Sequence, residues 1–124
     1  MSESAADMAF AQDLFSGIGR VEARRMFGGV GLFVGKAMFG LIDEGRIYLR
    51  TDEPLKAELK AAGAVSWIYA ERAGPKAGVP QETGYWSLPE GALDDPDEAC
   101  GWARRALAIA EARKAAASSK RRKG

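Results

Sequence analysis

The sequence predicts one α+β domain of two layers, with helices on an antiparallel five-stranded sheet in the order helix, three strands, helix, two strands, helix. Two observations support this prediction. Residues 24–50 hold three apolar, β-favouring runs that are separated by short links. Such links force neighbouring strands to run antiparallel, because a parallel return needs a long crossover. Runs with helical spacing precede and follow these strands.

The first helix is predicted around residues 4–15, where Ser4 is placed to cap it. Met8, Ala11 and Leu14 recur at helical spacing, and Gly17 can end the helix. The three strands are predicted at residues 26–34, 38–42 and 47–49, and residues 21–25 lead into the first of them. Gly35-Lys36 and Asp43-Glu44-Gly45 supply the turns between the strands.

Three glycines interrupt the first predicted strand, namely Gly28, Gly29 and Gly31. A phosphate-binding loop needs its glycines to open a helix, so that free amide groups face the anion. Here the glycines run into the apolar residues 32–34, which favour a strand. We therefore interpret them as sites of a bulge, or of close approach by another backbone.

The second helix is predicted to begin after a cap at Thr51 or Asp52 and to end at Gly63. Two strands follow at residues 66–70 and 84–88, joined by a loop rich in glycine and proline that we expect to be mobile. The acidic run 94–98 marks the start of a third helix rather than a metal site, because acids favour the positive helix end. That helix is predicted to continue to Ala117.

Composition narrows the function. The chain of 124 residues has one cysteine and no histidine, which excludes internal disulfides and imidazole catalysis. No pair of the remaining reactive side chains has a spacing that demands catalysis. We therefore expect a protein that is not an enzyme and needs no cofactor or metal. The acidic start without an apolar signal, and the lack of a membrane-spanning run, predict a cytoplasmic protein with no membrane partner.

The small net charge of +1 hides an uneven distribution. Residues 104–124 contain eight of the 18 basic and one of the 17 acidic residues, a net charge of +7 that leaves −6 on residues 1–103. We expect a domain over residues 1–113 and a frayed basic tail over 114–124. Two interpretations of the tail stay open, a solvated end or a nucleic-acid contact. The contact residues would be Arg113, Lys114, Lys120, Arg121, Arg122 and Lys123.

Four aromatic side chains lie on the last two predicted strands: Trp67, Tyr69, Tyr85 and Trp86. Aromatic residues mostly fill cores and pack across strands, which is the favoured interpretation. If several are exposed together, they mark a contact surface for a partner.

Several ordered motifs resemble one family. Arg24-Arg25-Met26-Phe27-Gly28-Gly29, followed after one residue by Gly31, is similar to the signature of the TfoX N-terminal domain family. Further matching segments occur at residues 38–52, 69, 85–89, 95–98 and 102–106. The resemblance covers roughly residues 8–110.

The resemblance implies a fold related to type III secretion chaperones, and in full-length members a regulator of natural competence that acts with the cyclic-AMP receptor protein. Those members carry a second domain similar to helix-hairpin-helix DNA-binding units, whereas this chain ends in a short basic segment. We expect a stand-alone N-terminal domain that binds a protein partner or itself as a homodimer, with a link to transcription. The expected contact surface is the signature Arg24, Arg25, Met26, Phe27, Gly28, Gly29 and Gly31. The alternative is nonspecific nucleic-acid binding through the basic tail.

Overall fold

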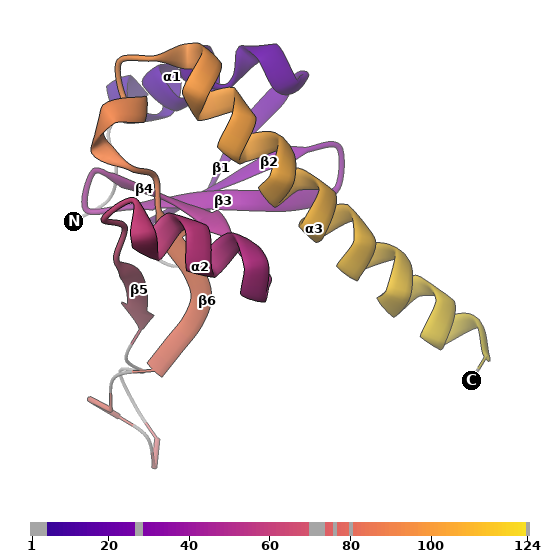
Figure 1. Cartoon of the computed structure of the whole chain (residues 1–124). Helices are drawn as coiled ribbons and strands as arrows, with labels where there is room; N and C mark the ends of the chain where they lie inside the picture. The colour runs from indigo at the N-terminus through magenta and orange to yellow at the C-terminus, as the bar shows by residue number, and fades with distance from the viewer. Residues whose placement is uncertain (1–4, 27–28, 70–73, 76, 80, 124) are drawn as a thin grey trace.

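The structure is a computed structural model that describes residues 5–26, 29–69, 74–75, 77–79 and 81–123. Helix α1 leads into the first four strands, α2 and two more strands follow, and the long helix α3 ends the chain (Figure 1). The bounds in chain order are α1 Ala5–Leu14, β1 Val21–Met26, β2 Gly29–Val34, β3 Ala37–Asp43, β4 Arg46–Arg50, α2 Glu53–Ala61, β5 Ser66–Tyr69, β6 Gln81–Ser87 and α3 Pro96–Lys123. Short 3-10 turns, η1 Ser16–Ile18 and η2 Glu90–Ala92, follow α1 and β6.

Six described strands form one sheet in the order β1-β2-β3-β4-β6-β5, and every neighbouring pair is antiparallel. The predicted α+β class and antiparallel sheet are thus confirmed, with one strand more than the five expected. The additional strand is β1, which the sequence analysis had treated as a lead-in. Its last residue, Met26, pairs with Gly29 at the start of β2, so the predicted first strand is in fact a hairpin.

Close approach of backbones explains two glycines of the central strands. A Cβ atom on Gly29 would lie 2.8 Å from the carbonyl oxygen of Ile42, and one on Gly40 would lie 2.7 Å from that of Tyr48. Both contacts are with backbone, which cannot move aside. The expected close approach is therefore confirmed for Gly29, and the register shift between Leu32 and Phe33 supplies the expected irregularity. Gly28 lies outside the described residues.

The link between β3 and β4 is a two-residue turn that matches the predicted position. Glu44 has φ 50° and Gly45 has φ 78°. Positive φ at both central residues is the signature of a type I′ turn, whose twist suits a tight hairpin. Asp43 therefore pairs directly with Arg46 across the turn.

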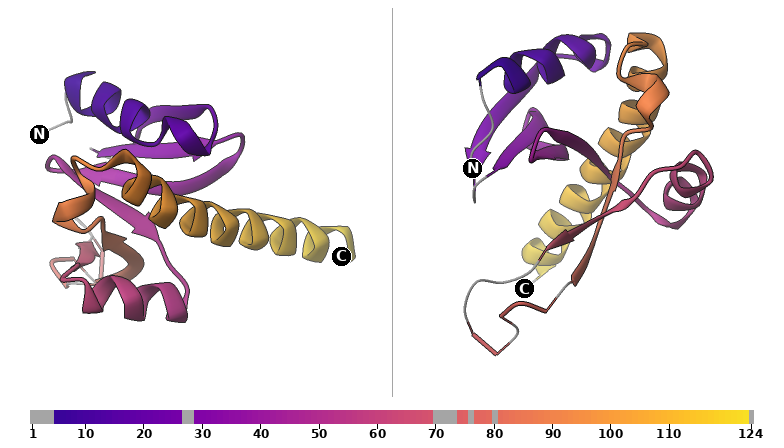
Figure 2. Two further views of the ribbon diagram at one scale, coloured as in Figure 1. Left: turned by 45° about the horizontal axis from the view of Figure 1, so that its top comes forward. Right: turned by 90° about the vertical axis from the view of Figure 1, so that its left-hand side faces the viewer.

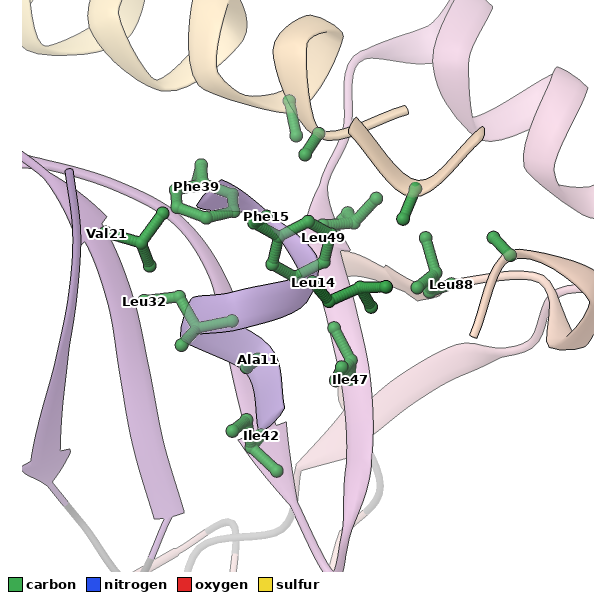
Figure 3. Packing of buried hydrophobic residues seen from close by; sticks show 14 of the residues in the cluster. Ala11, Leu14, Phe15, Val21, Leu32, Phe39, Ile42, Ile47, Leu49 and Leu88 are labelled. Atoms are coloured by element: carbon green, nitrogen blue, oxygen red, sulfur yellow. The ribbon is translucent and has the colours of Figure 1, made fainter. Parts of the chain in front are cut away.

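All three helices contribute to one hydrophobic core on the same face of the sheet (Figure 3). Phe15 and Phe39 meet edge to face, with ring centroids 5.6 Å apart. Leu55 and Leu59 of α2 extend the core towards Trp86 of β6. The helix α3 contributes small side chains, which let it pack closely on the sheet; they are Ala99, Ala103, Ala106 and Ala110.

Helix starts follow the predicted chemistry. Asp52 accepts a hydrogen bond from the backbone N–H of Leu55 at 3.0 Å, and Asp95 accepts one from Glu98 at 3.2 Å. On the surface, Arg105 of α3 donates to both carboxylate oxygens of Glu58 on α2, at 2.8 and 2.7 Å. This hydrogen-bonded pair lowers the pKa of Glu58.

The helix α3 extends beyond the end that the sequence predicted. It continues through residues 118–123, where fraying was expected after Ala117. Alanine, lysine and arginine are strong helix formers, and no glycine or proline interrupts them before Gly124. Residues 111–123, called here the projecting end of α3, run past the edge of the sheet in Figure 1 and in the left view of Figure 2. Likewise β6 begins at Gln81, earlier than the expected residue 84, and most of the preceding loop lies outside the described residues.

We predict that Gly40→Ala lowers the free energy of unfolding by about 1–3 kcal/mol, because its methyl group would overlap the backbone of β4. The measurement is urea denaturation followed by circular dichroism. Gly101→Ala is the matched control, since Gly101 lies in α3 with open space around it. That control should gain up to about 1 kcal/mol from helix propensity. Equal unfolding midpoints for Gly40→Ala and the original protein would contradict the close approach.

Candidate interaction surface

An open groove of about 1070 Å³ lies between the β2–β3 hairpin and α3. The turn Gly35-Lys36 forms one end, and residues of β4 and β6 reach it from the neighbouring part of the sheet. The side chains that matter for its chemistry are Met26, Phe33, Lys36, Met38, Arg50, Tyr85, Ala110, Glu111, Arg113, Lys114 and Ala117. The name "groove" is used below for this surface.

The floor of the groove is apolar and lies over Gly31, which has no side chain. A Cβ atom on Gly31 would lie 2.7 Å from Met26 Sδ, 2.8 Å from Phe33 Cε1 and 3.4 Å from Met38 Sδ. Three side chains from three strands therefore converge above Gly31. Each remains half-buried, because no described helix covers this face of the sheet. The result is an apolar floor that is open to contact.

Positive charge surrounds this floor. Lys36, Arg113 and Lys114 are exposed, and no described carboxylate forms a salt bridge with them. Arg50 lies over the ring of Tyr85, with Cζ 5.1 Å from the centroid. Against these four cations the lining holds a single acid, Glu111. The groove is therefore an apolar surface with a surplus of positive charge.

One wall of the groove is a face of α3. The lining residues Ala110, Arg113, Lys114 and Ala117 follow the spacing of i, i+3, i+4 and i+7, which places them on one side of a helix. Of the two alanines, only Ala117 is exposed to a neighbouring molecule. Because Ala110 is buried and Ala117 exposed, the wall begins in the core and ends on the projecting end of α3.

The residues of the predicted signature lie in different parts of the structure. Met26 and Gly31 meet at the groove floor. Arg24 lies beside them, with its Cζ 4.6 Å above the Phe33 ring, and forms a salt bridge of 2.7 Å with Glu22 that lowers the pKa of Glu22. Arg25 is exposed. Gly29 begins β2 and pairs with Met26 of β1, while Phe27 and Gly28 lie outside the described residues.

The basic residues predicted to contact nucleic acid are also divided. Arg113 and Lys114 line the groove. Lys120, Arg121, Arg122 and Lys123 belong to helical backbone farther along the projecting end of α3. Lys36 and Arg50, which sequence reasoning did not select, join the first pair because the β2–β3 turn and the end of β4 lie beside α3. The one signal in the sequence was the alternation of side chains along the strands around Gly31, which indicates that Phe33 and Met38 lie on the same face of the sheet.

The four aromatic residues have separate environments. Trp86 belongs to the core, as expected, and Tyr85 is buried on the opposite face. Trp67 meets Tyr85 edge to face at 6.1 Å, and its Nε1 donates to Asp43 Oδ2 at 2.9 Å. Tyr48 packs on the other side of Trp67, and burial raises the pKa of Tyr48. These contacts show cross-strand packing for Trp67 and Tyr85 and core packing for Trp86, whereas the side chain of Tyr69 lies outside the described part.

Other kinds of site have little support in the described residues. No group of three histidine, cysteine, aspartate or glutamate side chains among them could hold a metal ion. No helix in the described ranges is both long enough and apolar enough to cross a membrane. The single thiol, on Cys100, is buried against Leu14 and is 3.5 Å from its carbonyl oxygen. The groove is therefore the candidate functional site.

Comparison with known proteins identifies one family. The family model described as the TfoX N-terminal domain matches residues 13–110, which is most of the chain. No curated protein matches the sequence. The match includes the floor of the groove and Ala110, and it stops before Arg113.

An anionic aromatic dye tests the groove directly. We predict that 8-anilinonaphthalene-1-sulfonate binds the folded protein with increased fluorescence, because its rings suit the floor and its sulfonate suits the surrounding cations. Met38→Glu should abolish most of this increase. Lys60→Glu, which changes an exposed cation on α2, should preserve it. Equal fluorescence of both variants, with unchanged circular dichroism, would show that the dye binds elsewhere.

Proposed function

The chain belongs to the TfoX N-terminal domain family, and on that premise we propose that it is a non-enzymatic module that regulates transcription by binding a protein partner. In this proposal the partner occupies the groove, and the protein works in the cytoplasm, where transcription factors are available. The domain is TfoX-like and regulatory. The partner and the link to transcription are what we propose.

The groove is the observation on which this proposal rests. Exposing an apolar floor to water is unfavourable, and the cations beside it have no carboxylate partner among the described residues, so a complementary surface would gain by covering both. Interfaces are enriched in methionine, aromatic residues and arginine, and this groove presents all three. A reaction would instead require paired acids, bases or nucleophiles, and no hydrogen bond or salt bridge among the described residues pairs Glu111 with Lys36, Lys114 or Tyr85 of the lining.

The proposal predicts that the groove is needed for regulation in the native host. Deleting the gene should change the abundance of a defined set of transcripts, and the original protein should restore it. Met38→Glu should fail to restore it, because an apolar partner surface that covered the new carboxylate would remove its hydration at a cost in free energy. RNA sequencing of five strains provides the measurement: the parent, the deletion, and the deletion carrying the original protein, Met38→Glu or Lys60→Glu.

Protein abundance must be matched in these strains by immunoblot. Full restoration by Met38→Glu would contradict a regulatory role for the groove. Failure of Lys60→Glu at equal abundance would also contradict it, since that change lies on α2 outside the groove.

A second candidate function is nonspecific nucleic-acid binding through α3. Its support is the continuous helix that extends the basic residues away from the acidic body. Arg113 and Lys114 are exposed on it. Clustered cations of this kind release counterions from a phosphate backbone and bind without reading sequence.

This candidate predicts filter retention of duplex DNA at low salt. If all six basic residues of the predicted contact engage phosphates, the logarithm of affinity should fall with the logarithm of salt with a slope of about −5. Replacing the six residues with alanine should abolish retention, whereas Lys60→Ala should not. Equal retention by the six-fold variant would exclude α3 as the contact.

A further inference from the structure

We propose that the groove binds an amphipathic helix of a partner protein that carries acidic side chains beside its apolar stripe. The inference rests on the proposed function and adds the chemistry of the partner. Three features of the groove lead to it: a floor made by one face of the sheet, a wall made by one face of α3, and an excess of positive charge in the lining.

The floor favours a helix over an extended segment. The strands beneath it already pair with each other, so their backbone N–H and C=O groups are used within the sheet. An extended peptide laid on the face of the sheet would find no backbone partners there, and its own polar groups would be desolvated. A helix satisfies its backbone internally and presents only side chains to Met26, Phe33 and Met38.

The wall gives that helix a small contact point at its outer end. Ala117 is exposed on the α3 face, whereas Ala110 is buried where that face enters the core. The groove, at about 1070 Å³ and open to solvent, has room for part of a short helix. Two or three apolar anchors at spacings of three and four residues would cover the floor.

The charge specifies what flanks those anchors. Lys36 and Arg50 lie on the sheet side of the groove, and Arg113 and Lys114 lie on the α3 side. A helix lying between these pairs would place acidic residues on both edges of its apolar stripe within reach of cations. A basic helix would meet four like charges and one acid, Glu111.

A second copy of this chain is the competing occupant. Its acidic segment 94–98 begins α3, whose apolar face is already buried in its own core through Ala99 and Ala103. That segment cannot offer a free apolar stripe. The lack of a free apolar stripe beside that acidic segment therefore favours a helix from another protein.

The test uses the full chain and a fluorescein-labelled helical peptide of ~14 residues, long enough to retain some helix in water. Leucines at spacings of three and four form its stripe, and glutamates flank them. Two comparison peptides replace every glutamate with lysine, or scramble the sequence so that no stripe remains. We expect fluorescence anisotropy to show saturable binding of the acidic peptide, with affinity at least about tenfold above both comparison peptides and falling with added salt.

The protein variants separate the two parts of the inference. Met38→Glu should weaken binding about tenfold by placing a charge on the floor. Arg113→Glu with Lys114→Glu should weaken it by a similar factor, whereas Lys60→Glu should leave it unchanged. Circular dichroism of each variant verifies the fold. Equal affinity for the acidic and lysine peptides, or equal loss in Lys60→Glu, would overturn the proposal.

Two further results would overturn it differently. A dimer detected by light scattering that Met38→Glu dissociates would identify a second copy as the occupant. If Met38→Glu fails to restore transcripts in the host while the acidic peptide does not bind, the groove is used by a partner of other chemistry. If the peptide binds as expected and Met38→Glu restores the transcripts, the inference about chemistry holds and the regulatory role is lost.

Discussion

Space left by absent side chains determines how the central strands fit together. Gly29 and Gly40 each leave room that a backbone carbonyl oxygen of the neighbouring strand occupies, and Gly31 leaves room for Met26, Phe33 and Met38. The first two allow the strands to pack; the third lets the open face of the sheet collapse into a shallow apolar floor. Glycines of β2 and β3 thus shape both the strand packing and the candidate site.

Burial on one side of the sheet has a functional consequence. The helices use their apolar residues on the inner face, where Leu32, Phe39 and Leu49 are fully buried. The outer face is stabilised by contacts within the sheet, such as the Trp67–Asp43 hydrogen bond and the Trp67–Tyr85 ring pair. Part of it therefore remains available for another molecule, and α3 adds a wall because it continues beyond the core.

The fold brings basic residues from distant parts of the chain together. The sequence predicts a basic tail at the C-terminal end, but residues 113 and 114 belong to a helix that lies opposite Lys36 and Arg50 across the groove. Lys36, Arg50 and the adjacent pair Arg113 and Lys114 are far apart in the sequence but lie on one surface. Charges gathered in this way steer acidic partners and disfavour basic ones, which is how electrostatics contributes to specificity.

Local signals in the sequence determined the element types, the turn at Glu44-Gly45, the cap at Asp95 and the conclusion that the glycines belong to a sheet. Each of these depends on near neighbours in the chain. Local signals did not reveal that Val21–Met26 is a strand, because its antiparallel pairing with Gly29–Val34 had to be known. They did not reveal the groove either. Its lining comes from five strands and a helix, and only tertiary packing decides that Arg50, Lys36 and Arg113 face the same space.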